Sequence, residues 1–442
     1  MFIAVDDTDS RDGLCTTFVL TEIVRSLNDI GVDIIGDPKL IRLNPAVPWK
    51  TRGNASLVLQ AGIGSGERRK IGEINGKDVL CFSEMKADVN EDELMEKLIP
   101  AVIGNRASDS DTGLIVSKKR PSPELYWSGV RKILEQKDIE KELRSIGAKT
   151  FTQGCGRGLI GAACGLSWIP KDSTFELIAY RERKNWGTER TVDPETIRTV
   201  DATFESTFNS WEERFHKVTM VPSTPCPVLY GLRGDDHDDL LKAVDIIVSE
   251  KKDRWLIFLT NQGTDDHIIT DAAEPIPDSS YRIEGIVKGS ARHLKGGHTF
   301  LDLETKYGMM TCGLYEPSKE FRMVFDHLID GDMITVVGEL RNEPRTLNVE
   351  KILVNELKQL NRKISNPQCP KCGKKMKSIG KDQGYRCKEC RTRSKESIKE
   401  EGTRWIVPGW YEPPAAARRH LSKPLKRDNM EQKAEFVNRR IQ

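Results

Sequence analysis

Four cysteines near the carboxyl end of the chain form two closely spaced pairs. Cys369 and Cys372 flank a Pro-Lys dipeptide, and Cys387 and Cys390 flank a Lys-Glu dipeptide. Two Cys-x-x-Cys pairs at this separation match the ligand spacing of structural zinc sites. Four thiolates complete a tetrahedral Zn²⁺ shell and leave no open position for a substrate. The pattern therefore predicts a zinc ribbon that the metal helps to fold, and a redox role is the weaker interpretation because neither pair lies in a thioredoxin-like setting.

The segment that contains these pairs is strongly basic, although the whole chain is nearly neutral. Residues 362–395 hold twelve lysines and arginines against two acidic residues, an excess of ten positive charges, whereas the 442-residue chain has a formal net charge of +2. Compact basic modules neutralise the phosphates of nucleic acids. A solvated lysine-rich surface is the alternative. We expect this segment to bind nucleic acid.

The remaining cysteines and the amino-terminal residues bear on the compartment of the protein. The other six cysteines are scattered singly, which is typical of buried apolar residues in a reducing compartment. The chain begins with an apolar run of only a few residues and turns acidic at Asp6, unlike a secretory signal. No stretch approaches the ~18 apolar residues that span a bilayer. We expect a cytoplasmic protein without a membrane segment.

The region between residues 281 and 354 has the apolar pattern of a small β-barrel. Strands are predicted at 281–288, 299–303 and 309–312, a helix over 318–328, and two further strands at 333–338 and 347–354. Three strands, a helix and two strands is the element order of an OB-fold, which commonly binds oligonucleotides. A barrel with a purely structural role is the alternative.

The first 275 residues alternate between strand-like and helix-like patterns. An apolar strand at 2–5 precedes a helix that begins at Thr16, and this α/β texture continues to about residue 170. A second α/β or α+β unit over roughly 171–275 contains predicted strands at 175–180 and 255–259. The length alone predicts about three domains, whereas the changes in the pattern of predicted strands and helices favour four modules.

An acidic loop follows the first predicted strand. Asp6, Asp7 and Asp9 lie where α/β proteins place ligand loops. Carboxylates in one turn repel one another unless a cation lies between them, and hard oxygen ligands suit Mg²⁺ with nucleotide phosphates. Thr16 begins the next helix, where its hydroxyl could ligate metal, bind phosphate, accept a phosphoryl group or act only as an N-cap. An exposed acidic turn is the alternative for the loop.

A basic turn provides a second candidate. Lys50 and Arg52 precede Gly53 and Asn54, and such cations stabilise the charge on transferring phosphoryl groups. Alone, this string indicates an exposed basic turn, but beside an acidic metal loop it predicts an ATP-phosphate site. Neither a Walker A sequence nor the protein-kinase signatures are present. The glycines within 154–161 either cradle phosphate or permit tight backbone packing.

Several of these strings occur together, in a fixed order along essentially the whole chain. They are Asp6-Asp7-Thr8-Asp9-Ser10, Cys15-Thr16-Thr17, Leu43-Asn44-Pro45, Trp49-Lys50-Thr51-Arg52-Gly53-Asn54, Gly156-Arg157-Gly158-Leu159-Ile160-Gly161, Thr260-Asn261-Gln262-Gly263-Thr264 and Arg418-Arg419-His420-Leu421-Ser422-Lys423-Pro424-Leu425. In these strings the chain resembles the archaeal tRNA 2-agmatinylcytidine synthetases (TiaS), which act on the minor isoleucine tRNA. The resemblance implies a multidomain α+β protein with an α/β kinase-like catalytic domain, a ferredoxin-like domain, an OB-fold β-barrel and a C-terminal zinc ribbon.

The implied modules can be assigned to ranges of the chain. We expect the kinase-like catalytic domain over residues 1–170 and the ferredoxin-like domain over 171–275. The OB-fold RNA-binding domain is expected over 276–360, and the zinc ribbon with its tail over 361–425. Residues 426–442 run beyond the last motif and are expected to form a flexible extension.

The resemblance also implies a reaction and its cofactors. Such an enzyme uses ATP, Mg²⁺ and a structural Zn²⁺ to attach agmatine to C2 of the wobble cytidine in the CAU anticodon, so that the isoleucine tRNA decodes AUA. The implied route phosphorylates the cytidine O2, which an amine then displaces. By motif, Thr16 corresponds to the family's autophosphorylated threonine, and Asp6, Asp7 and Asp9 correspond to its metal and phosphate loop.

Further binding residues are assigned by motif and by chemistry. The ATP-binding candidates are Thr8, Lys50, Arg52, Gly53 and Asn54. Agmatine is a dication, so its pocket should contain carboxylates. By chemistry alone the candidates are Asp235, Asp236, Asp265 and Asp266. Two alternatives stay open: a non-catalytic single-stranded nucleic-acid-binding protein with an OB-fold and a zinc ribbon, and a small-molecule phosphotransferase.

Overall fold

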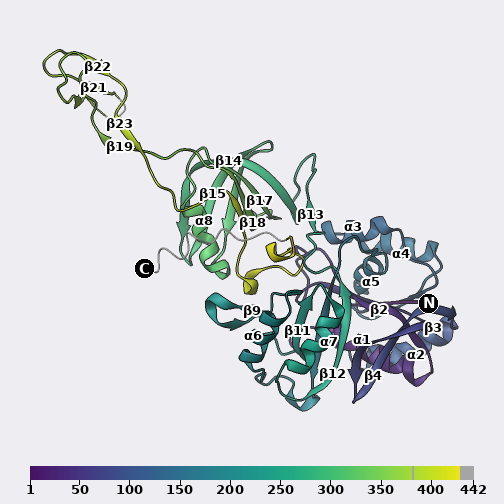
Figure 1. The fold of residues 1–442 in the computed structure, drawn as a ribbon. Coiled ribbons are helices and arrows are strands. Elements are labelled where there is room, and N and C mark those ends of the chain that lie inside the picture. Colours follow the sequence, from purple (N-terminus) through teal and green to yellow (C-terminus); the bar gives the residue numbers. More distant parts are fainter. Residues whose placement is uncertain (381–382, 429–442) are drawn as a thin grey trace.

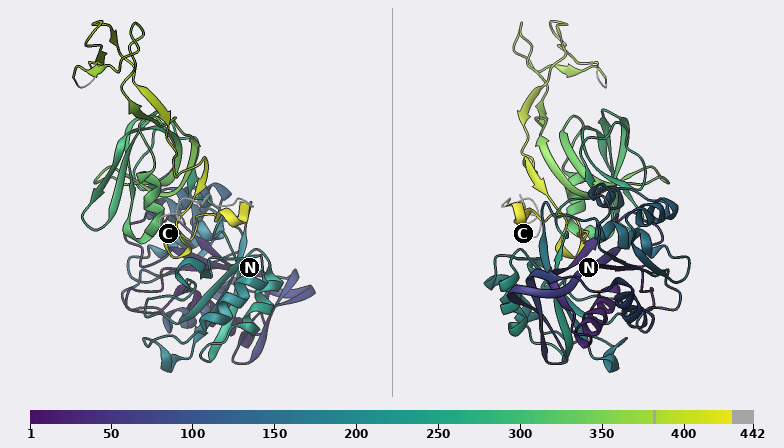
Figure 2. Two further views of the ribbon diagram at one scale, coloured as in Figure 1. Left: turned by 60° about the vertical axis from the view of Figure 1, so that its left-hand side comes forward. Right: turned by 90° about the vertical axis from the view of Figure 1, so that its right-hand side faces the viewer.

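The structure is a computed structural model that describes residues 1–380 and 383–428. It is a multidomain α+β protein with a large amino-terminal body, a β-barrel beside it and a small ribbon that projects from the barrel (Figures 1 and 2). Within these two ranges no helix is long and apolar enough to cross a membrane. Most of the predicted extension, residues 429–442, lies outside the described residues.

The first part of the body alternates strands with helices. Its elements are β1 (Phe2–Asp6), α1 (Thr16–Asp29), β2 (Asp33–Arg42), β3 (Ala55–Ile74), β4 (Lys77–Ala87), α2 (Glu91–Ile103), β5 (Gly113–Ser117), α3 (Pro123–Arg131), α4 (Gln136–Ser145), β6 (Lys149–Thr152) and α5 (Gly158–Leu166). The apolar residues that predicted a helix after Thr16 are buried in α1, so this prediction is confirmed. Local signals define other helix starts: the Asn90 side chain accepts hydrogen bonds from two backbone amides of α2, and Ser122 caps α3.

The second part of the body is also mixed. Its elements are β7 (Thr174–Arg181), η1 (Arg183–Asn185), α6 (Pro194–Thr203), β8 (Thr207–Phe208), β9 (Trp211–Glu212), η2 (Glu213–Phe215), β10 (Lys217–Val218), β11 (Val228–Gly234), α7 (His237–Ile246) and β12 (Lys252–Thr260). The predicted strands at 175–180 and 255–259 correspond to β7 and β12.

One continuous sheet runs through both parts of the body. Its ten strands lie in the order β6-β5-β1-β3-β4-β2-β12-β7-β11-β8. The two parts join where β2 lies parallel to β12, with Thr260 opposite Leu40, and β3 also pairs with β12. Because parallel strands end at the same edge, the loops that follow β2 and β12 meet there. This edge carries much of the candidate site.

The barrel is formed by strands whose hydrogen-bonded pairs close into a circuit. Its elements, with the short strand that precedes them, are β13 (Ile268–Ile269), β14 (Ser279–Leu294), β15 (His298–Thr305), β16 (Gly308–Leu314), η3 (Glu316–Arg322), α8 (Met323–Asp326), β17 (Met333–Leu340) and β18 (Leu347–Glu356). The circuit runs β14-β15-β16-β18-β17 and returns to β14, and only the β16–β18 pair is parallel. The predicted order of three strands, a helix and two strands is confirmed.

The predicted helix over 318–328 is wrong as a continuous element. Lys319 has φ 50° and ψ −124°, which interrupts the helical backbone, so a 3₁₀ segment (η3) and the single turn of α8 replace it. The apolar face was nevertheless identified correctly, because Phe321, Val324, Phe325 and Leu328 are buried in the barrel core. Burial of these side chains therefore does not require one regular helix.

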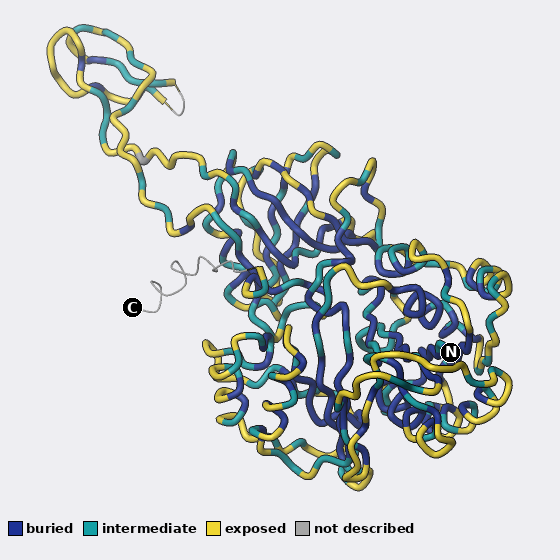
Figure 3. The backbone as a smooth tube through the Cα atoms, turned by 45° about the vertical axis from the view of Figure 1, so that its right-hand side comes forward, coloured by how far each residue is buried: buried dark blue, intermediate teal, exposed yellow. Residues whose placement is uncertain are grey.

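The ribbon leaves and rejoins the barrel through a two-stranded stalk. Its elements and the tail that follows are β19 (Asn361–Ser365), β20 (Lys377–Ser378), β21 (Tyr385–Arg386), β22 (Arg393–Ser394), β23 (Ile398–Glu401), β24 (Gly409–Tyr411), η4 (Ala415–Ala417) and η5 (Leu425–Asp428). The stalk is the antiparallel pair β19–β23, and the returning chain adds β24 to β18. Figure 3 shows buried backbone concentrated in the body and barrel, whereas the ribbon is mostly exposed or intermediate.

Candidate active site

The acidic loop begins at the carboxyl end of β1. Asp6 is buried, and burial together with the charge of Asp7 raises the pKa of its carboxyl group well above the ordinary value. Burial also raises the pKa of Asp7 to about 6, and the charges of Asp9 and Asp111 add to the rise. The shared cause is that several carboxylates lie in one poorly solvated turn. The loop would be stabilised by a cation.

Glycines of α5 allow its first turns to lie directly against this loop. A Cβ atom at Gly161 would overlap Oδ2 of Asp6, and one at Gly158 would lie 2.7 Å from the backbone oxygen of Asp6. No side chain fits at either position. Close backbone packing therefore explains these two glycines, and both also line the cavity described below.

Thr16 stands at the start of α1 and faces the acidic loop. Its Oγ1 atom accepts a hydrogen bond from the backbone N–H of Thr8 at 3.4 Å. The side chain of Cys15, the N-cap residue, bonds to Oγ1 of Thr17 at 3.1 Å and caps no backbone N–H of the helix, so the first turn of α1 keeps the positive end of its dipole available to an anion. The Oγ1 atom of Thr8 is buried and has no hydrogen-bond partner in the part of the chain that the structure describes.

The basic turn meets the acidic loop, because β3 begins next to the end of β1, with Val5 opposite Leu57. Arg52 donates from Nε and Nη2 to Oδ2 of Asp9, at 2.9 and 2.5 Å, and its guanidinium also reaches the backbone oxygen of Leu14. Thr51 donates to Oδ1 of Asp9 at 3.0 Å. Two strings that are separate in the sequence are thus joined by one guanidinium.

The other residues of the basic turn lie deeper or nearer the barrel. Lys50 donates to the backbone oxygen of Pro45, and burial and the charge of Arg419 lower the pKa of its ammonium group. Asn54 donates to the backbone oxygen of Asn44 at 2.9 Å. A Cβ atom at Gly53 would overlap Nη1 of Arg42, so a larger residue would displace the end of that side chain.

The loop after β12 contacts a second group of charged side chains at the same edge. Asn261 accepts from the backbone N–H of Arg42 at 2.7 Å and donates to its carbonyl oxygen at 2.8 Å. Gln262 accepts from Nε of Arg42 at 3.3 Å and donates to Glu176. Arg233 donates to Oε1 of Glu176 at 3.0 Å. Glu176 is therefore a buried carboxylate between two guanidinium groups.

The carboxyl-terminal tail also reaches the site. The backbone oxygens of His420 and Leu421 accept hydrogen bonds from the N–H groups of Gly263 and Asp265, each at 2.8 Å. The charge of Arg42, followed by the low-dielectric surroundings and the charge of Arg233, lowers the pKa of the His420 imidazole well below its ordinary value. The ring is therefore neutral at neutral pH.

These groups surround one cavity of about 270 Å³, which is lined by both parts of the body and by the tail. The predicted site residues that line it are Asp6, Asp7, Asp9, Thr16, Lys50, Arg52, Gly53 and Asn54. Thr8 is buried behind this lining. Arg42, Glu176, Arg233 and His420 also line the cavity, and the sequence did not single out any of them as a site residue.

The four aspartates predicted for agmatine lie outside this lining and already have partners within the protein. Asp235 pairs with Arg427 at 2.8 Å, and Asp236 caps α7. Asp265 accepts from the ammonium of Lys351 and from the backbone N–H of Lys423. The fourth, Asp266, accepts a hydrogen bond from the Tyr126 hydroxyl at 2.5 Å. Of the four, Asp235 and Asp265 hold the carboxyl-terminal tail.

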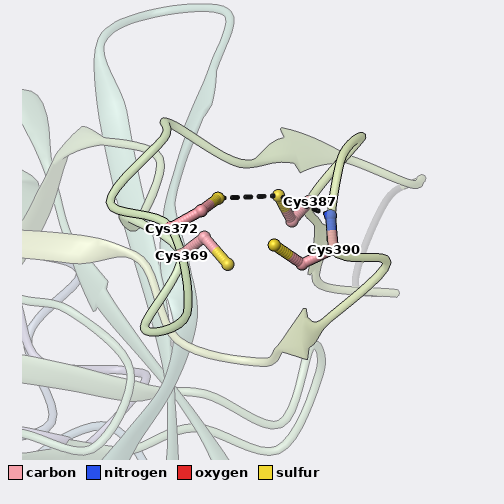
Figure 4. A group of neighbouring side chains, drawn as sticks. All are labelled: Cys369, Cys372, Cys387 and Cys390. Carbon is pink, nitrogen blue, oxygen red and sulfur yellow. Dashed lines mark hydrogen bonds between the residues drawn. The ribbon is translucent and has the colours of Figure 1, made fainter.

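The four cysteines of the ribbon converge, as Figure 4 shows. Their Sγ atoms all lie within 4.8 Å of one another, and those of Cys372 and Cys387 are 3.6 Å apart. Tetrahedral Zn–S bonds of about 2.3 Å place neighbouring sulfurs about 3.8 Å apart, so this donor set fits Zn²⁺. The buried residues of the ribbon core are Cys369, Met376 and Cys387. So small a core depends on the metal for its stability.

The fold and the site together define a multidomain α+β protein with a polar cavity in its body and a zinc ribbon near its carboxyl end. Family models described as the TiaS TCKD domain, the TiaS FLD domain and the TiaS C-terminal zinc ribbon domain match residues 2–155, 156–267 and 366–406. The chain belongs to the family of the tRNA 2-agmatinylcytidine synthetases (TiaS) that act on an isoleucine tRNA. A TiaS of Archaeoglobus fulgidus is 36% identical to it over 439 residues, which cover 98% of each chain.

Solved structures support the same assignment. A crystal structure of TiaS in complex with its isoleucine tRNA and ATP matches with a TM-score of 0.84 and 34% identity, over 98% of this chain and 99% of that one. A crystal structure of TiaS with the same tRNA species, AMPCPP and agmatine matches with a TM-score of 0.83 and 31% identity, over the same shares of the two chains. The likeness therefore extends over the body, the barrel and the ribbon.

Proposed function

We propose that the chain attaches agmatine to C2 of the wobble cytidine of the minor isoleucine tRNA, in an ATP-dependent reaction that lets the CAU anticodon decode AUA. The observation that carries this proposal is the cavity, where the acidic loop, Thr16 and the basic turn meet in a chain that matches TiaS along its length. The proteins it resembles were crystallised with an isoleucine tRNA, with ATP or its analogue and with agmatine.

The chemistry requires activation of the cytidine. A carbonyl oxygen is a poor leaving group, so a phosphoryl group is first transferred from ATP to O2 of the base. The agmatine amine then forms a bond to C2 while the C2–O2 bond breaks, phosphate departs with the oxygen, and the amine loses a proton. Both steps involve highly charged oxygens, which cations and helix N-termini stabilise.

The cavity residues take distinct parts in this proposal. Asp6, Asp7 and Asp9 would hold Mg²⁺, which when bound neutralises phosphate charge. Crowded carboxylates, two of them with raised pKa values, fit a cation. Thr16 is the proposed acceptor of a phosphoryl group at the start of α1. Lys50 and Arg52 are the proposed phosphate-binding cations, and Arg52 also positions Asp9.

Agmatine must enter the same cavity, because its amine has to reach C2 of the activated base. The four predicted aspartates lie outside the lining and are bound to other protein groups. They can receive agmatine only if those contacts open. Within the lining, Glu176 is a carboxylate already placed to hold guanidinium groups, since Arg42 and Arg233 contact it. Because these two arginines already neutralise Glu176, it can receive the agmatine guanidinium only in place of one of them.

The finer architecture is proposed on the same basis. Residues 1–170 are the kinase-like catalytic domain and 171–275 the ferredoxin-like domain. The closed strand circuit with one parallel pair supports an OB-fold over 276–360. Residues 361–425 comprise the Zn²⁺-bound ribbon and its tail. The cytoplasm, where tRNA is modified, is the proposed compartment.

The proposal is tested by incubating the protein with ATP, labelled agmatine and a transcript of the minor isoleucine tRNA. Label should enter the CAU transcript and be absent from a matched transcript with U at the wobble position. Uracil has a carbonyl group at C4 in place of the cytosine amino group, so it is not the substrate base. No transfer to the CAU transcript, or equal transfer to both, contradicts the synthetase function. Transfer without ATP would contradict the activation step.

A further inference from the structure

One aromatic side chain of the cavity has no role in the reaction described above. Trp49 lines the cavity and is 47% exposed, an unusual degree of exposure for a tryptophan. The guanidinium of Arg157 lies 4.9 Å from the centre of its ring. Arg157 is itself held by Asp111, with an Nη1–Oδ2 distance of 3.8 Å. The ring and the guanidinium thus form a stacked pair that faces a binding space.

Part of the lining of this cavity is apolar. Val47, Ile133, Leu134 and Ile160 also line the cavity, whereas the acidic loop, Thr16 and the basic turn belong to its polar part. Flat aromatic rings of ligands bind such walls by stacking on Trp or Arg, since a nucleobase has a polarisable face of matching size. The chemical class that fits this wall is a nucleobase.

Two nucleobases take part in the proposed function, the adenine of ATP and the wobble cytosine. Only the cytosine is attached to a polymer, so it has to be extruded from the anticodon stack and enter from the outside. The Trp49 ring is half-exposed, so it lies at the open side of the cavity, which a base that enters from outside reaches first.

We infer that Trp49, with the Arg157 guanidinium on its ring, is the platform on which the extruded wobble cytosine stacks. The inference rests on the proposed function. Stacking of a base on an aromatic side chain strengthens binding about 5- to 150-fold, which compensates part of the cost of removing the base from the anticodon loop. Stacking also fixes the orientation of the base, so that C2 and O2 keep a constant position relative to the other groups of the cavity. Trp49 is thus a positioning residue for the base.

The test uses the full-length protein and a CAU transcript that carries pyrrolo-cytidine, a fluorescent cytidine, at the wobble position. Its fluorescence should be quenched when the wild-type protein binds, because the base stacks on Trp49. Trp49→Ala should lose this quenching and lower kcat/KM for unlabelled tRNA about 5- to 150-fold, with ATP affinity unchanged. Trp49→Phe should restore most of both. Phe215→Ala, which removes an exposed ring outside the cavity, is the matched control.

The possible outcomes distinguish the stacking of cytosine on Trp49 from the proposed agmatine transfer. Full quenching of the pyrrolo-cytidine fluorescence by Trp49→Ala overturns the inference. If Trp49→Ala also lowers the affinity for ATP while this quenching stays intact, the platform belongs to the adenine of ATP. A Trp49→Phe protein as impaired as Trp49→Ala also contradicts stacking. Failure of the wild-type protein to transfer agmatine contradicts the proposed function instead, and the quenching measurement still reports whether the base stacks.

Discussion

At the scale of single residues, Arg52 and Thr16 show that the site depends on the geometry of individual hydrogen bonds and not on charge alone. Arg52 donates two hydrogen bonds to Asp9 and also reaches the backbone of the turn before α1. A guanidinium can do this because its donors are fixed in a plane. The position of α1, and hence of Thr16, is therefore coupled to the basic turn. The site is a set of mutually positioned groups.

Thr16→Ala should abolish turnover while the protein stays folded. The change removes the proposed phosphoryl acceptor, so agmatine transfer should fall by about 100-fold or more. The only side-chain hydrogen bond of Thr16 in the described structure is the long one from Thr8, whose loss costs about 1 kcal/mol at most. Transfer of labelled agmatine and filter binding of tRNA measure the two effects.

Thr16→Ser is the matched control for this prediction. It keeps the hydroxyl group and should retain measurable turnover, and its phosphorylation can be followed with labelled ATP. Normal turnover by Thr16→Ala would remove Thr16 from the mechanism. Loss of tRNA binding in the same variant would show instead that the residue is structural.

The sequence motifs predicted much of this site but not all of it. Asp6, Thr16 and Arg52 belong to strings that are recognisable locally, and the structure brings them into one cavity. Glu176 and Arg233 carry no local signal, because their pairing arises from β7 and β11 lying side by side. His420 was part of a recognised string, but only the path of the tail places it beside Gly53.

At the scale of elements, local patterns predicted well where burial follows a regular period. The strands of the barrel and helix α1 are examples. The helix expected over 318–328 failed because the apolar spacing reports which side chains are buried and does not detect the left-handed residue Lys319. The strands of the stalk are short and polar, and β24 forms only by pairing with the distant strand β18. The sequence therefore contains no periodic apolar pattern for either of them.

The ribbon gives an element-scale prediction. Cys387→Ser should remove zinc and unfold the ribbon, because three thiolates and a core of a few buried residues cannot hold it. Zinc content should fall from about one equivalent to nearly none, and tRNA affinity should weaken about tenfold or more as basic residues lose their arrangement. Elemental analysis and filter binding measure these effects.

ATP binding at the distant cavity should change little in Cys387→Ser. Cys155→Ser is the matched control, because Cys155 is an exposed thiol outside the cluster and its loss should leave zinc content unchanged. Unchanged tRNA affinity in Cys387→Ser, with zinc lost, would exclude the ribbon as an RNA-binding module.

At the scale of the whole molecule, the carboxyl-terminal tail joins the barrel to the body. Arg419 pairs with Glu339 of β17 and with Glu350 of β18. On the other side, Arg427 pairs with Asp172 and Asp235 of the body. The segment between these anchors carries His420 into the cavity. The tail therefore connects the expected RNA-binding modules with the candidate active-site cavity through charged contacts.

Arg419→Ala should destabilise this connection. Glu339 and Glu350 are buried and would each lose a cation, although Arg341 and His267 still contact them. We expect a loss of about 2–3 kcal/mol of unfolding free energy, measured by denaturant titration. Turnover should fall further than stability alone explains, since the tail beside His420 would lose its anchor on the barrel and keep only its backbone bonds to the body.

Adding Glu339→Gln to Arg419→Ala should recover part of the lost stability, because it removes a buried charge that has lost one of its two arginine partners. It should not recover turnover. Arg345→Ala is the control, since Arg345 is exposed and makes one backbone hydrogen bond at 3.3 Å. An Arg419→Ala protein with wild-type stability and turnover would show that the tail is dispensable.

The continuous sheet has a consequence for how such a chain can be inherited or divided. A cut near residue 170 would separate β12 from β2 and β3 and leave two open sheet edges, each a template for aggregation. The two parts of the body therefore share one sheet and depend on each other to cover their strand edges. The barrel closes its own hydrogen-bond circuit, and both strands of the ribbon's stalk start from one place. Those two modules are the pieces that recombination could add, replace or lengthen without opening the sheet of the body.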